Sequence, residues 1–287
     1  MRAVQIRELK ALPEPVELAG GGSIVVEAVA LNPLDVNVGS GLFYGGHPPL
    51  PYVPGCEAVG RTEDGDLVYL FGEGRGIGKD GFLAERVDVP DDLPLRLPAG
   101  TDPALGAVTG IAGVAAWVPV AWKARVTPED RVLVLGGTGA VGQIAAQAAR
   151  LLGAAQVVAV GRADLDRIGD EFGDDGFTVC IDPVWGEPLA KALAHAAPHA
   201  RIVHLGQSAG PESPLRSADV RGKELVLMGH SNFALSKADR ERAQLELLEH
   251  LTAGRISIDV ERYPLDQVAE AWERQRSGPG AKVVVEV

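Results

Sequence analysis

The sequence predicts an α/β protein with two parts, a β-rich part and a part built on a parallel sheet. Three observations predict it: the length, a change of pattern near residue 101, and a glycine-rich turn between a strand and a helix. At about 150 residues per domain, 287 residues make about two domains. Short β-branched runs and turns fill the first hundred residues, and after Gly254 the chain returns to short strands.

In the first part, β-branched and aromatic residues gather in short runs that glycine-containing turns separate. The expected strands are residues 23–30, 66–71 and 82–89. From about residue 101, apolar runs alternate with Ala- and Leu-rich segments, which is typical of βαβ units and a parallel sheet. Strands are expected at 131–135, 156–160, 177–181, 201–205, 224–228 and 282–287, and helices at 141–152 and 237–251.

Composition and charge exclude several classes of protein. The net charge of -12, with 39 acidic and 27 basic residues, argues against general binding to nucleic acid or to an anionic membrane. Two cysteines, Cys56 and Cys180, cannot form a disulfide-rich scaffold, so a reducing compartment is expected. Charges interrupt any apolar leader at the N-terminus, and we expect a cytoplasmic protein.

One uncharged stretch, residues 104–122, is long enough to cross a bilayer. Three glycines and Pro119 interrupt it, and alanine is its commonest residue. A buried helix or a domain junction therefore explains this stretch better than a membrane span does.

The sharpest motif is a G-x-G-x-x-G sequence directly after the strand expected at 131–135. It lies between that strand and the next helix, which is the context that dinucleotide binding requires. The glycines permit a tight turn, close approach to a pyrophosphate and close helix packing, and the helix N-terminus attracts the anion. The alternative is a glycine-rich turn without a ligand. The predicted cofactor-binding residues here are Gly137, Thr138, Gly139, Ala140, Val141 and Gly142.

Taken with other motifs in order, the sequence resembles the medium-chain dehydrogenases/reductases, specifically the zinc-free quinone oxidoreductase and enoyl reductase branch. The resemblance covers nearly the whole chain. It rests on N-P-L-D at 32–35, P-G-C-E-A-V-G at 54–60, G-F-L-A-E at 81–85, the glycine turn, G-R at 161–162, R-I-V-H-L-G at 201–206, Y-P-L at 263–265 and K-V-V-V at 282–285.

The resemblance implies a GroES-like β-rich partial barrel, built from both chain ends, with an inserted Rossmann doubly wound parallel sheet. The implied domains are residues 1–100 plus 256–287 and residues 101–255. The chain is shorter than usual between the second Rossmann strand and Phe177, so trimmed helices are expected there. Asn32 and Cys56 stand where zinc-dependent relatives have ligands, so no metal is expected.

The resemblance implies NADPH-dependent, zinc-independent reduction of an enone, an enoyl compound or a quinone by hydride transfer. NADPH is expected because the second Rossmann strand ends in Gly161 and Arg162, without the carboxylate that binds an NAD ribose. Arg167 could add a second positive charge. Asp164 and Asp166 lie nearby and are interpreted as residues of the first turn of the next helix.

Further site residues are expectations of the same resemblance. Asn32 could orient the nicotinamide or substrate, or simply satisfy a turn. Tyr44 could donate a proton, or be a pocket-wall or surface residue. The nicotinamide end is assigned to Gly206, Gly229 and Ser231, and the substrate pocket to Phe43, Tyr44, Tyr52 and Phe233.

Other functions remain open. Phe43 at the family's Tyr position and Ala115 at a frequent Thr position leave open a non-catalytic NADPH-binding protein. The other alternative is a zinc-free carbonyl/alcohol oxidoreductase that uses the same cofactor. The G-x-S-x-G sequence at 206–210 would make Ser208 a hydrolase nucleophile, but two prolines follow where a helix must begin. The expected partners are a small-molecule substrate and a second copy of the chain, paired through the apolar strand at 224–229.

Overall fold

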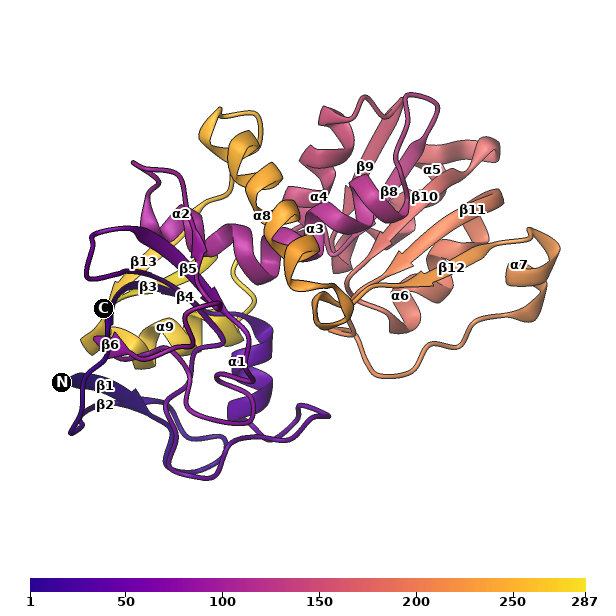
Figure 1. The fold of residues 1–287 in the computed structure, drawn as a ribbon. Helices are drawn as coiled ribbons and strands as arrows, with labels where there is room; N and C mark the ends of the chain where they lie inside the picture. The colour runs from indigo at the N-terminus through magenta and orange to yellow at the C-terminus, as the bar shows by residue number, and fades with distance from the viewer. The chain divides into compact units, whose positions relative to one another are not determined.

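The structure is a computed structural model that describes residues 1–287. The chain forms two compact units (Figure 1). Unit 1 comprises Met1–Ile111 and Asp259–Val287, and unit 2 comprises Ala112–Ile258. The domain boundaries expected from the sequence, after residues 100 and 255, lie slightly before these divisions.

Unit 1 is organised around a seven-stranded sheet with the order β13-β14-β3-β4-β5-β7, in which β6 also pairs with β3. Only β13 and β14 are parallel; the other pairs are antiparallel. The strands are β3 (Ile24–Ala30), β4 (Glu57–Arg61), β5 (Leu67–Phe71), β6 (Arg86–Val87), β7 (Leu95–Arg96), β13 (Val260–Pro264) and β14 (Lys282–Glu286).

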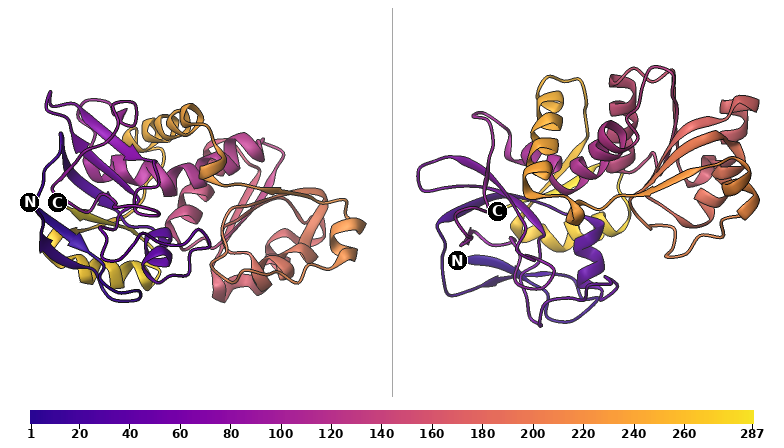
Figure 2. Two further views of the ribbon diagram at one scale, coloured as in Figure 1. Left: turned by 60° about the horizontal axis from the view of Figure 1, so that its bottom comes forward. Right: turned by 45° about the vertical axis from the view of Figure 1, so that its right-hand side comes forward.

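Both ends of the chain contribute to unit 1, as the resemblance implies. The N-terminal hairpin of β1 (Arg2–Gln5) and β2 (Glu14–Glu17) is bridged to the rest through Ala3–Ala84 and Ile6–Tyr52. The C-terminal strand β14 pairs with β3, and the two termini lie near one another in every view (Figure 2). Helices α1 (Pro33–Gly39) and α9 (Val268–Arg276) pack together, and η7 (Leu265–Gln267) precedes α9.

A helical segment, Pro103–Lys123, carries the apolar stretch noted in the sequence. It consists of α2 (Pro103–Val108), the turn η1 (Thr109–Gly113), α3 (Val114–Val118) and the turn η2 (Pro119–Lys123), with a kink at Gly110. By length and hydropathy it could cross a membrane, but 78% of its most apolar window is buried. Burial within the protein therefore explains its apolar composition, and the division between the two units falls inside it.

Unit 2 contains a five-stranded parallel sheet with the order β12-β11-β10-β8-β9. Its strands are β8 (Arg131–Leu135), β9 (Gln156–Val160), β10 (Phe177–Asp182), β11 (Ala196–His204) and β12 (Val226–Gly229). The direction in which successive strands are added to the sheet reverses at β8, because β9 lies on one side of β8 and β10 lies on the other. The carboxyl ends of β8 and β10 therefore flank the switch point, where such sheets bind ligands.

Helices cover both faces of this sheet, because right-handed crossovers in opposite directions lie on opposite faces. Helix α4 (Ala140–Leu151) packs with α3, which also packs against α8 (Lys237–Thr252). The connection from β9 to β10 has only short elements, as the sequence predicts: η3 (Arg162–Arg167), α5 (Ile168–Phe172) and η4 (Gly173–Asp175). The remaining elements are α6 (Gly186–Ala192), η5 (Leu193–His195), α7 (Ser217–Gly222) and η6 (Asn232–Ala234).

The strand expected at residues 82–89 is wrong over most of its length, since only Arg86 and Val87 form a strand there. The backbone of Phe82 and Leu83 donates instead to the carbonyls of Gly55 and Pro54, outside any regular ladder. The segment therefore contributes to unit 1 through these loop contacts, and it is not extended alongside one partner strand.

Candidate functional site

The turn between β8 and α4 is built so tightly that it requires glycine. Gly136, just before the motif, has a positive φ of 62°. A Cβ on Gly142 would lie 2.3 Å from the Gly136 carbonyl oxygen, and one on Gly137 would lie 2.7 Å from the Ala159 Cβ. The backbone N–H of Gly137 donates to the Val160 carbonyl at 2.9 Å, which fixes the turn against the end of β9.

The first N–H groups of α4 are available to a ligand. Gly139 is the N-cap residue, and no side chain caps the helix. The first ladder bond runs from the Gln143 N–H to the Gly139 carbonyl, so Ala140, Val141 and Gly142 point unpaired N–H groups out of the helix end. Such an N-terminus binds phosphate, and the exposed Thr138 lies beside it.

Arg162 and Arg167, the two arginines expected near the adenosine half of the cofactor, differ in their ion pairs. Arg162 is exposed at the end of β9, directly after the buried Gly161, and forms no ion pair. Arg167 is paired with Glu171 at 2.6 Å and lies 3.8 Å from Asp164. Arg167 is therefore not a second unpaired cation, because the carboxylates of Glu171 and Asp164 lie beside its guanidinium.

The loops after β10 and β11 pack directly against the glycine turn. A Cβ on Gly136 would lie 2.9 Å from Val184 Cγ1, and one on Gly206 would lie 2.5 Å from the Pro183 carbonyl oxygen. The backbone N–H of Ala209 donates to the Val184 carbonyl at 2.8 Å. The glycine turn and these two loops therefore form one continuous surface at the carboxyl edge of the sheet.

The remaining residues assigned to the nicotinamide end follow β12. Gly229 is exposed, and its carbonyl accepts from Lys123 Nζ at 2.6 Å. Ser231 caps η6 by accepting from the backbone N–H of Phe233. Phe233 itself is 49% exposed. These residues lie at the edge of the sheet, as expected from their position after a parallel strand.

Sequence reasoning missed a histidine–aspartate pair at this same edge. Asp182 ends β10, His204 ends β11, and the two are opposite each other in the strand register. Nδ1 of His204 lies 3.0 Å from Asp182 Oδ2, and the ring of Trp185 lies against the imidazole. The sequence contains a signal for this pair: Asp182 and His204 each end a parallel strand, and the carboxyl ends of parallel strands meet at one edge of the sheet. From the sequence, the motif at 201–206 is interpreted only as part of the family resemblance.

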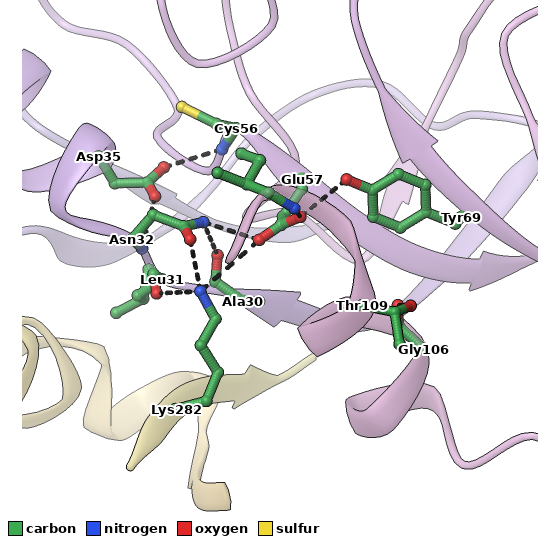
Figure 3. A network of polar contacts seen from close by, with 11 residues as sticks. Ala30, Leu31, Asn32, Asp35, Cys56, Glu57, Tyr69, Gly106, Thr109 and Lys282 are labelled. Carbon is green, nitrogen blue, oxygen red and sulfur yellow. Dashed lines mark hydrogen bonds and ion pairs between the residues drawn. The ribbon is translucent and has the colours of Figure 1, made fainter. Parts of the chain in front are cut away.

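Unit 1 contains a buried polar network centred on Glu57 and Lys282 (Figure 3). Oε2 of Glu57 accepts from the Tyr69 hydroxyl at 2.7 Å and from the Ile111 backbone N–H at 2.6 Å. Lys282 Nζ donates to the Leu31 carbonyl at 2.8 Å and lies 3.7 Å from Glu57 Oε1. The network joins β14, β4 and the kinked helix within one unit.

Asn32 belongs to this network and has no side-chain donor left for a ligand. Its Nδ2 donates to the Ala30 carbonyl at 3.0 Å and to Glu57 Oε1 at 2.7 Å, and its Oδ1 accepts from Lys282. The side chain is 2% exposed. Asn32 also starts α1 through a capping box with Asp35. The hydrogen bonds of the Asn32 side chain are thus used inside unit 1, and neither of its amide hydrogens is left for the expected contact with nicotinamide or substrate.

Burial opposes the charges of this network. It raises the pKa of Glu57, against the attraction of Lys282 and the hydrogen bonds from Asn32, Ile111 and Tyr69. It raises the pKa of Asp35 as well, and it lowers the pKa of Lys282 against the attraction of Glu57 and Asp35. Removing one partner of such a buried pair costs more than the pair contributes, since an uncompensated charge stays behind.

These residues do not fit a zinc ion. Burial and the neighbouring Asp35 raise the pKa of Cys56 well above its usual value, which disfavours the thiolate that binds zinc. The Asn32 amide oxygen is engaged by the ammonium group of Lys282, a cation that would repel a second one. No group of three or more His, Cys, Asp or Glu side chains could hold a metal ion.

The aromatic residues assigned to the substrate pocket lie in different environments. Tyr44 is 86% exposed, and its ring lies against that of Phe43, at 4.5 Å between centroids. Phe43 is partly buried against the core of unit 1. Tyr52 is 1% exposed in that core, and its hydroxyl is buried without a partner, so the structure does not place it on an open pocket wall.

The hydrolase interpretation of Ser208 is wrong. A nucleophile elbow needs a strand, a sharp turn and a helix in direct succession. Here β11 ends at His204, an irregular segment follows, and the next helix begins only at Ser217.

Comparisons with known proteins extend over the whole chain. Residues 152–285 match the sequence model of a family described as zinc-binding dehydrogenase. Human quinone oxidoreductase is 27% identical over 285 residues, covering 90% of this chain and 86% of that protein. An NAD-dependent alcohol dehydrogenase structure matches with a TM-score of 0.85 at 24% identity, each chain covered completely. The quinone oxidoreductase of Thermus thermophilus, solved also with NADPH, gives 0.80 at 24% identity over all of both chains.

These matches confirm the predicted fold class. The family match begins after Asn32 and Cys56, so it does not include the positions that correspond to zinc ligands. The two similar structures differ in their dinucleotide: one is an NAD-dependent enzyme and the other was solved with NADPH. At 24% sequence identity, each supports the fold of this chain and not its cofactor.

Proposed function

We propose that this chain is a medium-chain dehydrogenase/reductase related to the quinone oxidoreductases, and that it is an NADPH-dependent oxidoreductase. Its proposed substrate is a conjugated carbonyl compound or a quinone, and no catalytic metal takes part. The relatives named quinone oxidoreductase support the reaction class. The residues of unit 2 support the cofactor.

The observation that carries the proposal is the end of β9 beside the glycine turn. A Rossmann domain that prefers NAD places a carboxylate here to bind the ribose 2′-hydroxyl. This chain has Gly161 instead, where a Cβ would lie 3.1 Å from Thr138 Cγ2 of the glycine turn, and the next residue is Arg162, whose guanidinium is exposed and unpaired. A 2′-phosphate meets a planar set of donors at Arg162, and the strand itself ends without a carboxylate. The Asp164 carboxylate is the nearest negative group: a Cβ on Gly161 would lie 3.5 Å from its Oδ2, and Arg167 lies 3.8 Å from it.

NADPH supplies a hydride when bound. The turn from Gly137 to Gly142 and the open N-terminus of α4 bind its pyrophosphate. The backbone groups of Gly206, Gly229 and Ser231, at the carboxyl edge of β11 and β12, orient the nicotinamide end.

Hydride addition to the β-carbon of an enone leaves negative charge on the carbonyl oxygen. Hydrogen-bond donors must stabilise that charge, because the residues around Asn32 do not fit a metal. Asn32 and Glu57 contribute indirectly by fixing the start of α1 and the strands beside it.

Turnover measured with NADPH over a panel of enones, quinones and aldehydes tests the proposal. We expect steady oxidation of NADPH with enones or quinones that is insensitive to a chelator. Preferred reduction of aldehydes would favour a zinc-free carbonyl/alcohol oxidoreductase. Tight NADPH binding without turnover on any substrate would indicate a non-catalytic binding protein, and no binding of NADPH would refute the proposal.

A further inference from the structure

A histidine with one free ring nitrogen lies at the carboxyl edge of the sheet in unit 2. Asp182 is fully buried, and its Oδ1 accepts from the backbone N–H groups of Val184 at 3.0 Å and Trp185 at 2.8 Å. Its Oδ2 lies 3.0 Å from Nδ1 of His204. The carboxylate therefore holds the proton on Nδ1, and Nε2 is left as a hydrogen-bond acceptor.

That acceptor is open to a ligand. The structure has three buried side-chain nitrogen or oxygen atoms without a hydrogen-bond partner: Tyr52 Oη, Arg75 Nε and His230 Nδ1. Nε2 of His204 is not one of them, so this nitrogen is not buried without a partner. The His204 side chain is 30% exposed, whereas its partner Asp182 is completely covered. Asp182 thus holds Nδ1 of the imidazole from the buried side, and Nε2 faces solvent.

Trp185 restrains the same imidazole. Its ring centroid lies 4.1 Å from that of His204. Its backbone has a positive φ of 59°, which is strained for a bulky residue and is held by the bond to Asp182. Strain of this kind gathers at ligand sites, where the surrounding structure fixes a side chain in place.

The position of His204 along the sheet determines which part of a dinucleotide it meets. Arg162 marks the adenosine end at β9, and the glycine turn after β8 holds the pyrophosphate. The other half of the cofactor must then extend over β10 and β11. Neighbouring strands are about 5 Å apart, so the end of β11 lies about 10 Å from that of β8, and the nicotinamide ribose directly follows the pyrophosphate.

We propose that Nε2 of His204 accepts a hydrogen bond from a ribose hydroxyl in the nicotinamide half of NADPH. The inference rests on the proposed function and deepens it. Asp182 and Trp185 are positioning residues, because they act through His204. The site recognises ribose, whereas Arg162 recognises the 2′-phosphate at the opposite end.

The test is calorimetric titration of the full chain with NADPH and with 2′,5′-ADP, which lacks the nicotinamide half. His204→Asn keeps an amide N–H near Asp182 but has no atom at the Nε2 position. We expect this variant to bind NADPH five- to tenfold more weakly than the parent and 2′,5′-ADP within twofold of it. His199→Asn, on the exposed start of the same strand, is the matched control and should bind both as the parent does.

A second variant separates the acceptor from the packing. His204→Gln can place its amide oxygen near the Nε2 position, and we expect it to bind NADPH within about threefold of the parent. Parent-like NADPH binding by His204→Asn would overturn the inference, and so would an equal loss of NADPH and 2′,5′-ADP. If the parent binds neither ligand, the proposed function itself fails. If the parent binds both and only the His204 effect is missing, the proposed function stands.

Discussion

Arg162 provides the sharpest test of cofactor choice at the scale of single residues. Its guanidinium is exposed and unpaired, whereas Arg167 is engaged by Glu171. We expect the parent to prefer NADPH over NADH at least tenfold in kcat/KM, which is about 1.4 kcal/mol. Arg162→Ala should reduce that preference, mainly by raising the KM for NADPH.

Arg167→Ala is the matched control for this measurement. It removes the same charge from the same short segment but leaves Arg162 unchanged, so the preference for NADPH should remain. Equal use of the two cofactors by the parent protein would contradict the prediction.

His230 is the one buried histidine among the six, and its Nδ1 has no partner. Burial lowers its pKa from 6.5 to about 4. The folded state therefore favours the neutral ring. That contribution to stability is complete above pH 6.5 and is lost as the pH falls through about 4.

His230→Gln should remove this pH dependence. Between pH 7 and pH 4 the parent should lose about 3 kcal/mol of unfolding free energy relative to the variant, as the unfolded histidine takes up its proton. Urea unfolding at both pH values measures the difference. A constant difference between parent and variant would show that His230 titrates normally in the folded protein.

Tyr44 tests the source of the proton. Its side chain is 86% exposed and its only ring contact is Phe43, so nothing in unit 1 fixes its hydroxyl against a reacting atom. We expect Tyr44→Phe to keep kcat within about threefold of the parent, because a positioned acid would contribute about 10²–10⁴. A loss of a hundredfold in steady-state turnover would establish Tyr44 as the acid.

The sequence predicted some site residues better than others for a physical reason. The glycine turn is local, since its strand, turn and helix are contiguous and its spacing reflects its geometry. Asn32 is different, because the ammonium group that engages its oxygen comes from Lys282, 250 positions away in the chain. Spacing alone could not reveal that its hydrogen bonds are already satisfied.

At the scale of elements, the kink in the helical segment depends on Gly110. A Cβ there would lie 2.1 Å from Glu57 Oε2 and 2.2 Å from the Tyr69 hydroxyl. Gly110→Ala should therefore displace the Glu57 carboxylate from the Ile111 N–H and destabilise the protein by about 3 kcal/mol.

Gly222→Ala is the control, because nothing lies within 4 Å of a Cβ at that helical position. It should be neutral or stabilise the protein by about 0.5–1 kcal/mol. Urea unfolding followed by tryptophan fluorescence measures both variants. Equal stability of the two variants would mean that the kink does not depend on glycine.

The elements of unit 2 were predicted more closely than those of unit 1. Strands β8 and β9 have the expected bounds, because each is a short, mainly apolar run between turns, and β8 is buried along nearly its whole length. Strands β6 and β7 have two residues each, too few for a sequence pattern, and exist only through their partners β3 and β5.

At the scale of the whole molecule, the edge strand β12 predicts a homodimer. Val226 and Leu227 are 47% and 38% exposed on this outer strand, which has a free backbone edge. We expect light scattering to give twice the chain mass of 30.0 kDa at micromolar concentration. Val226→Lys should yield the single-chain mass.

Leu245→Lys is the matched control, since Leu245 is an aliphatic residue on α8 that is also exposed, at 37%. Its assembly should equal that of the parent. A parent mass of 30.0 kDa would remove the basis for pairing through β12.

The discontinuity of unit 1 along the chain has a consequence for biosynthesis. A ribosome makes β3 long before β14, and all of unit 2 is synthesised between them. Unit 2 can therefore fold on the growing chain before unit 1 is complete. Until β14 is synthesised, one edge of β3 has no partner strand and Glu57 lacks the ammonium group of Lys282. In this protein the segment translated first is completed last, the reverse of the usual N-terminal-first order of domain folding.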